Sequence, residues 1–314
     1  MIGYYKKIDG VLAEVGPAES EWIHVRAPLD NSELEFLAHQ EDVPLDFLID
    51  SLDIDERSRY EREDEVRLIV INAPLVNSDE KESDALYITA PIGIILKSDR
   101  ILTITSAETQ VMERFLKDRV KQFDPADHKH FVLQIFEQTV FQYLDVLKKL
   151  NLKRNVIEKE LYHSSRNREL QQLLRIEKSL VYVLNSLSDN DLLKQKMKRT
   201  DFLKIRELEA HQDLFEDIII DNSQALEMAN VHTNLLNGTM EAYASIISNN
   251  LNVVIHRLTI VTIVLMVPTI VFSFYGMNLD LPFKEYKGTS YLMILLSLII
   301  SGLLITIFRR SGNV

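Results

Sequence analysis

Residues 258–278 read LTIVTIVLMVPTIVFSFYGMN, an apolar run without a charged residue that ends in the tetrapeptide 275–278. A second uncharged apolar run, 291–308, follows after a short connection. A helix needs roughly 20 mainly apolar residues to cross the ~30 Å hydrocarbon layer, and both runs reach this length with their flanking residues. The sequence therefore predicts two transmembrane helices, 258–275 and that second run, joined by a loop, 276–290, that is too short to form a domain.

One face of the first span carries regularly spaced small and polar residues. An apolar core stripe would show Leu and Ile at these positions. In lipid, a polar stripe faces protein or a water-filled path. The alternative is that the hydroxyl groups bond back to their own helix backbone and only assist packing. We predict that the stripe lines a pore, and we name it the pore stripe: Asn252, Ile255, Leu258, Thr262, Met266, Thr269 and Ser273, preceded along the chain by Gly238, Ala242, Ser245 and Asn249.

Pro268 interrupts the hydrogen bonding inside the first span. Proline has no N–H to donate, so the carbonyl oxygen of Val264 loses its usual partner in the helix. That oxygen is a candidate cation ligand if it faces the pore.

Residues 1–125 are expected to form a mixed α/β domain, which together with the helices after it makes the fold class α+β. Short β-favourable runs alternate with breaks that contain Gly, Pro and Asp. The capping-box spacing of Ser32 and Glu35 predicts a helix through Gln40, and 44–52 offers another. Strands are expected at 1–7, 11–15, 22–27, 67–75, 87–96 and 100–105.

The next part of the chain is helical in pattern. Residues 126–267 contain no proline and one glycine, and their apolar residues recur at three- and four-residue intervals. We predict two long antiparallel helices within 126–200, with breaks near 163–166 and 188–190. A third part, 201–314, would then consist of a stalk helix that runs on into the first span, the loop and the second span.

The charge of the chain is unevenly divided. Residues 1–250 carry 30 Lys and Arg against 45 Asp and Glu, a net charge of −15, whereas residues 251–314 carry 5 against 2. Such acidity argues against a nucleic-acid partner, which needs clustered positive charge. It suits a cation, although acidity alone also serves solubility. We find no cysteine, export signal, phosphate loop or paired catalytic groups, so we expect a protein that is not an enzyme and whose acidic part stays in the compartment where it is made.

These features together resemble the CorA family of magnesium transporters. The resemblance rests on Tyr275, Gly276, Met277 and Asn278 at the end of the first of two C-terminal spans, and it extends to the strand 91–96. It implies a homopentamer whose first span lines the pore and whose second span faces lipid. It also implies that Gly276-Met277-Asn278 forms the selective mouth, for Mg²⁺ as cargo, with Co²⁺ and Ni²⁺ as further candidates.

The residue types at the mouth suit a hydrated magnesium ion. Mg²⁺ gives up its octahedral waters reluctantly, so a selective mouth can bind the ion with its water shell. A ring of Asn278 amide oxygens, one per subunit, could accept hydrogen bonds from these waters. Gly276 would permit a tight backbone at the helix end. Leu258 and Met266 could form a dry constriction that closes by dewetting.

The resemblance also implies a regulatory Mg²⁺ held between carboxylates of neighbouring subunits. By position these would be Asp50 in the soluble domain and Asp217 on the stalk helix. A bridging ion cancels the repulsion of two carboxylates only in the arrangement that brings them together, which is how a ligand shifts a conformational equilibrium. High internal Mg²⁺ would then close the pore. The alternative is that both residues are ordinary solvated acids.

The charges that flank the spans indicate an orientation. Arg257 precedes the first span and Arg309 and Arg310 follow the second, whereas the connecting loop balances its lysines against Asp280 and Glu285. Positive flanks stay inside, so we expect a multi-pass protein of the cell (inner or plasma) membrane with both termini cytoplasmic. Two other functions remain open: a zinc transporter of the same fold, which Met277 disfavours, and a membrane-anchored cation sensor or scaffold, which would have no use for a polar stripe.

Overall fold

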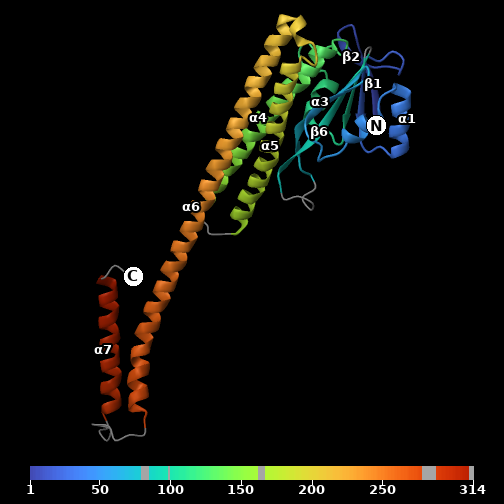
Figure 1. Ribbon diagram of the computed structural model, residues 1–314. Helices are drawn as coiled ribbons and strands as arrows, with labels where there is room; N and C mark the ends of the chain where they lie inside the picture. The colour runs from blue at the N-terminus through green and yellow to red at the C-terminus, as the bar shows by residue number, and fades with distance from the viewer. Residues whose placement is uncertain (79–84, 98–99, 162–166, 278–287, 311–314) are drawn as a thin grey trace. The chain divides into compact units, whose positions relative to one another are not determined.

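The computed structural model describes residues 1–78, 85–97, 100–161, 167–277 and 288–310. The chain forms two compact units, Met1–Met240 and Glu241–Val314. The first unit holds a seven-stranded sheet with helices on both faces, and the second holds two apolar helices (Figure 1). The expected fold class, a mixed α/β domain followed by long helices and two C-terminal apolar helices, is confirmed.

The sheet has the strand order β2-β1-β3-β7-β6-β5-β4, and β3 and β7 are its parallel pair. Successive side chains of a strand point to opposite faces. In β5, Leu68 and Val70 therefore enter one core while Ile69 and Ile71 enter the other. The strands are β1 (Ile2–Ile8), β2 (Val11–Glu14), β3 (Trp22–Arg26), β4 (Arg59–Glu63), β5 (Val66–Val76), β6 (Tyr87–Leu96) and β7 (Ile101–Thr105).

Helices cover both faces of the sheet, which explains why its central strands β7 and β6 are almost completely buried. On one face, α1 (Asn31–Glu41) and α2 (Leu45–Asp50) bury Leu34, Leu37 and Phe47. On the other face, α3 (Gln110–Leu116) and α4 (His128–Leu161) enclose Trp22, whose ring meets that of Phe131 edge-on at 5.2 Å.

Three local features differ from the sequence-based expectations. The helix cap at Ser32 and Glu35 is wrong: Asp30 caps α1 by accepting from the Glu33 N–H at 2.7 Å, and the Glu33 carboxylate accepts from the Asp30 N–H at 2.9 Å. Strand β4 was missed because it reads as an Arg and Glu run, a composition typical of a protected sheet edge. Helix α3 was also missed.

The long helices follow α3. They are α4, α5 (Asn167–Thr200), α6 (Glu209–Tyr275) and α7 (Thr289–Arg310). The predicted break at 188–190 is wrong, because α5 runs through it, and the one at 163–166 lies outside the described residues. Helix α6 begins eight residues later than position 201. Asp201 has a left-handed backbone and its carboxylate accepts from the Ile205 N–H at 2.9 Å, which shapes a short turn before the helix.

Asn190 remains helical because its side chain serves the sheet. Its amide accepts from the Asn72 N–H at 3.1 Å and donates to the Asn72 carbonyl at 2.8 Å. Strand β4 pairs with β5 only as far as Val70, so Asn72 begins an edge without a strand neighbour there. Further along this edge, Gln142 of α4 donates to the Pro74 carbonyl at 3.0 Å. Side chains of α4 and α5 thus replace the missing strand, and we call Asn72–Val76 the open edge of β5.

Lys194, one turn after Asn190, joins three helices. Its ammonium group is fully buried, donates to Asn222 Oδ1 of α6 at 2.7 Å and lies 5.8 Å from the centre of the Phe136 ring of α4. Burial lowers the pKa of Lys194 to about 7, against the opposing effect of the Asp191 carboxylate. The α4–α5–α6 packing therefore encloses an amine that titrates near neutral pH.

Candidate functional site

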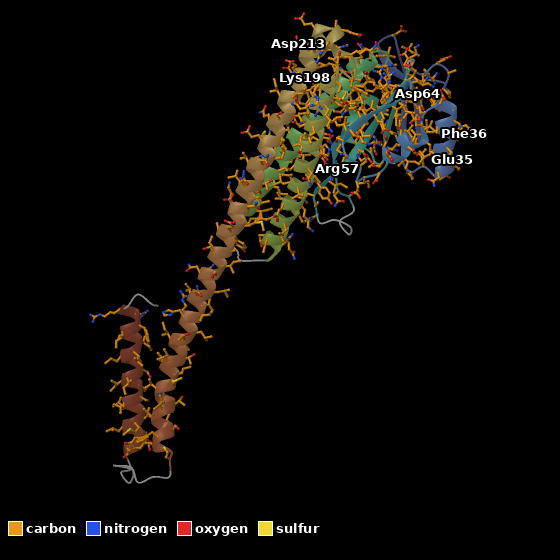
Figure 2. All side chains as sticks on the ribbon, in the orientation of Figure 1. Glu35, Phe36, Arg57, Asp64, Lys198 and Asp213 are labelled. Carbon is orange, nitrogen blue, oxygen red and sulfur yellow. The ribbon has the colours of Figure 1, made fainter. Side chains whose placement is uncertain are left out.

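Two helices have the length and composition of membrane spans: the C-terminal part of α6, and α7. Only 6% and 11% of their most apolar 18-residue windows are buried, whereas a core helix of a soluble protein would be mostly buried. Figure 2 shows mainly carbon on the side chains of α7 and, by contrast, many nitrogen and oxygen atoms on those of the first unit. An apolar surface of this extent requires lipid or protein around it.

The residues of the pore stripe are all exposed on α6. Helix α7 packs against another face, where Ile260 is 8% exposed and Val264 and Val271 are half-buried. At about 100° per residue, the pore stripe lies on roughly the opposite side of α6 from these three. The exposed positions are Asn252, Ile255, Leu258, Thr262, Met266, Thr269 and Ser273. This face is free of α7 along its whole length.

The threonine hydroxyl groups of the first span bond back to their own helix. Thr259, Thr262 and Thr269 each donate to the carbonyl oxygen four residues earlier, at 2.9, 2.8 and 3.0 Å. For these hydroxyl hydrogens, the alternative named in the sequence analysis therefore holds: they bond back to the backbone of their own helix. Each hydroxyl oxygen still has lone pairs that accept hydrogen bonds. The threonines therefore offer acceptors rather than donors to their surroundings.

The carbonyl oxygen of Val264 has a partner in the second span. Pro268 lies inside α6 and cannot donate to it. The Ser301 hydroxyl of α7 donates to this oxygen instead, at 3.3 Å. The oxygen thus faces α7 rather than the pore stripe, and the condition under which it would be a pore ligand is not met. The sequence indicated the freed carbonyl but not its partner 37 residues away.

The mouth residues follow the end of α6. The Gly276 N–H donates to the Phe272 carbonyl at 2.8 Å, and Met277 is 47% exposed. A Cβ atom added at Gly276 would lie 3.0 Å from the Phe272 oxygen, tighter than most side chains tolerate. Glycine therefore suits this position because the backbone passes close to itself. Asn278 lies outside the described residues.

The two acids predicted to hold a regulatory ion are not brought together by hydrogen bonds or ion pairs in the described part of the chain. Asp50 at the end of α2 forms an ion pair with Arg59 of β4 at 2.6 Å. Arg59 also pairs with Glu56, at 2.8 Å, and with Glu61. Asp217 is exposed on α6. The Arg59 guanidinium thus pairs with three carboxylates, one of which is that of Asp50. A cation that binds Asp50 must compete with Arg59.

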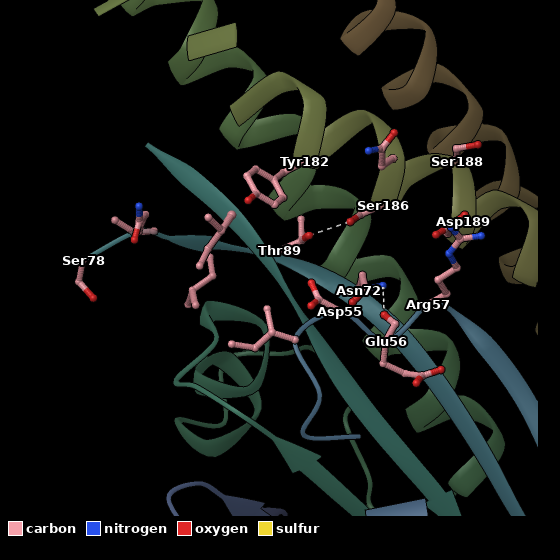
Figure 3. Close-up of a pocket in the computed structure, with 16 residues that line it drawn as sticks. Asp55, Glu56, Arg57, Asn72, Ser78, Thr89, Tyr182, Ser186, Ser188 and Asp189 are labelled. Carbon is pink, nitrogen blue, oxygen red and sulfur yellow. Dashed lines mark hydrogen bonds between the residues drawn. The ribbon is translucent and has the colours of Figure 1, made fainter. Parts of the chain in front are cut away.

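A cavity of about 710 Å³ lies between the segment 54–57, the ends of β5 and β6, and α5 (Figure 3). Polar and apolar side chains both line it, and Ser186 of α5 donates to Thr89 of β6 at 2.8 Å within it. Asp55 and Asp189 add negative charge. Among the residues that the structure describes, however, no three His, Asp or Glu side chains are arranged to hold a metal ion, here or elsewhere.

Comparisons with known proteins agree on one family. A family model described as CorA-like Mg²⁺ transporter protein matches residues 17–310. The cobalt/magnesium transport protein CorA of Methanocaldococcus jannaschii is 27% identical over 296 residues, which cover 93% of this chain and 90% of that protein. The complete structure of the CorA magnesium transporter from the same organism has a TM-score of 0.81 at 23% identity, over 100% of this chain and 99% of that one. The ZntB cytoplasmic domain from Vibrio parahaemolyticus has a TM-score of 0.62 at 9% identity, over 79% of this chain and 98% of that one, a likeness of fold alone.

Proposed function

Because the chain belongs to the family of CorA-like Mg²⁺ transporters, we propose that it conducts hydrated Mg²⁺ through a pore lined by the pore stripe of α6. The observation that carries this proposal is the exposure of the whole stripe on the face of α6 opposite α7. A single helix cannot enclose a path, so the channel is a homo-oligomer, and the family resemblance favours a pentamer. The positive flanks of the spans favour cytoplasmic termini.

The chemistry of the stripe suits an ion that keeps its water shell. The waters around Mg²⁺ direct their hydrogens outward, so the pore wall must accept hydrogen bonds. The hydroxyl groups of Thr262 and Thr269 donate their hydrogens to the helix backbone, so their oxygens remain as acceptors, and Asn252 adds an amide oxygen. Leu258 and Met266 would form the dry constriction. The absence of a carboxylate from the stripe leaves nothing in it that would trap a dication.

The purified protein in liposomes tests this proposal. Vesicles loaded with a metal-sensitive dye are given Mg²⁺, Co²⁺ or Zn²⁺ outside, with protein-free vesicles as the control. We expect saturable Mg²⁺ influx that grows when the interior is made negative. Influx of Zn²⁺ without Mg²⁺ would assign the zinc function instead, and metal binding without any influx would assign a sensor or scaffold.

A substitution at Gly238 tests whether the face of α6 that carries the pore stripe also meets the symmetry axis at this earlier position. A Cβ atom at Gly238 meets nothing within 4 Å, so Gly238→Trp should leave the fold of the single chain unchanged. In an oligomer with this face on the axis, five indole rings would collide. We expect at least a tenfold loss of Mg²⁺ flux in liposomes or a smaller assembly in size-exclusion chromatography. Asn237→Trp, exposed but about 100° away around the helix, is the matched control. Native size together with native flux in Gly238→Trp would show that this face does not meet the axis.

Asp50 and Asp217 are proposed to bind a regulatory Mg²⁺ between subunits. Replacing both by Asn keeps their shape but weakens metal bridging, so the variant should need at least fivefold more internal Mg²⁺ for half-inhibition of flux. Protection of the soluble part from protease by Mg²⁺ should weaken in parallel. Asp213→Asn, an exposed acid one turn before Asp217, is the control. If the double variant keeps the native Mg²⁺ dependence in both assays, this pair is not the sensor.

A further inference from the structure

Two carbonyl oxygens beside Pro268 are held by hydroxyl groups from different helices. Val264 has lost its donor in α6 and accepts from Ser301 of α7 at 3.3 Å. Leu265, the next residue, accepts from the Thr269 hydroxyl of α6 itself at 3.0 Å. The backbone of α6 is therefore supported at its proline from both its own side chain and the second span.

Ser301 is placed for this contact by the packing of the two spans. It is 8% exposed in a helix whose large apolar side chains are mostly exposed, and the side of α6 that it meets carries the half-buried Val264. Ser297, one turn earlier, is 1% exposed but donates to the carbonyl of Ile294 within α7 at 2.8 Å. Two serines with similar burial thus differ in the helix that receives their hydrogen bond.

We propose that Ser301 is a positioning residue for the conduction path. By holding the Val264 carbonyl, it fixes the direction in which α6 continues beyond Pro268, and the second span thereby sets the place of the mouth. This inference rests on the proposed function of α6 as the pore helix. It assigns α7 a role in selectivity through one hydrogen bond, in addition to its contact with lipid.

The part of α6 beyond Pro268 is long enough that a small change in its direction would displace the mouth. Seven residues separate Pro268 from Tyr275 at the end of α6, which is about 10 Å of helix. A tilt of about 10° at Pro268 would therefore move the mouth by about 2 Å. This displacement is about as large as the distance from Mg²⁺ to its bound waters. It would therefore misplace hydrogen-bond acceptors that are arranged around the hydrated ion.

A double-mutant cycle tests the contact directly. In Pro268→Ala the backbone regains an N–H that can serve Val264, so the Ser301 hydroxyl should no longer be needed. We expect Ser301→Ala to lower the folded-to-unfolded ratio of the detergent-solubilised protein about threefold in the native background and to leave it unchanged in Pro268→Ala. Ser297→Ala, the matched control, should show no such dependence on Pro268.

Ion flux supplies the readout for positioning. A loss of folded protein lowers the flux of every cation equally, whereas a displaced mouth changes the ratio of Mg²⁺ to Ca²⁺ flux. We expect Ser301→Ala to lower this ratio at least threefold in liposomes and Ser297→Ala to leave it unchanged. An equal loss of stability from Ser301→Ala in both backgrounds, no loss in either, or an unchanged flux ratio would overturn the proposal. If the native protein moves no Mg²⁺ at all, the proposed function fails, while the stability cycle still decides whether the contact exists.

Discussion

Asn278→Ala is expected to abolish Mg²⁺ uptake while the assembly stays intact. The side-chain amide would accept hydrogen bonds from the waters of the hydrated ion, and alanine offers no acceptor. A net hydrogen bond contributes about 1 kcal/mol, so in the proposed pentamer the loss of one from each subunit would weaken occupancy of the mouth by on the order of 5 kcal/mol. Even with incomplete additivity, we expect at least a hundredfold lower rate.

Mg²⁺ uptake into liposomes and size-exclusion chromatography check this prediction together. Asn250→Ala serves as the matched control, because Asn250 is an exposed asparagine of α6 outside the pore stripe. It should retain native uptake. Unchanged uptake in a correctly assembled Asn278→Ala would remove the selectivity role from Asn278.

Lys194→Met is expected to remove a pH dependence of the free energy of unfolding of the first unit, Met1–Met240. Burial lowers the pKa of Lys194 from 10.5 to about 7. Between these two values the unfolded chain binds a proton that the folded chain does not, so stability rises with pH by about 1.4 kcal/mol per unit. It falls as the pH drops toward 7, and below 7 both states carry the proton, so the slope disappears. Across the whole interval of about 3.5 pH units the difference is roughly 5 kcal/mol.

Urea unfolding of the full-length protein at pH 7.5, 8.5 and 9.5 measures this slope. Methionine has a similar length and no charge, and the Asp191 carboxylate beside Lys194 remains in both proteins. The difference in slope between the native protein and the variant therefore isolates Lys194. Lys198→Met, one turn later on α5 and exposed beside Glu216, should keep the native slope. Equal slopes for the native protein and Lys194→Met would show that Lys194 stays protonated when buried.

The two apolar spans could be predicted from the sequence. A span must be long, apolar and uncharged, and the predicted end of the first span at 275 agrees with the last residue of α6, Tyr275. Strand β6 was also predicted with its observed bounds, 87–96, because an apolar run of that length between turn residues leaves little choice.

The contacts between distant side chains could not be predicted in the same way. The periodicity that defines a helix says nothing about which helix a buried side chain will meet. Asn190 suggested a break because asparagine competes with the helix backbone, but its amide instead completes the edge of a strand. Lys194 reads as an ordinary charged position of α5, and only the packing of α4 and α6 shows that it is buried. Ser301 and Val264 are 37 residues apart, and only the packing of the two spans brings them together.

The edges of the sheet limit how copies of this chain can associate. Helices α4 and α5 cover the open edge of β5, charged residues line β4, and at the far edge the Leu12 N–H of β2 donates to Asp118 at 3.4 Å. These features oppose the continuation of the sheet by a strand of a neighbouring copy. In the proposed oligomer, the soluble parts must meet through side chains. Neighbours joined in this way can slip past one another in small steps without breaking a backbone ladder, and the proposed closure of the pore at high internal Mg²⁺ would need such movement.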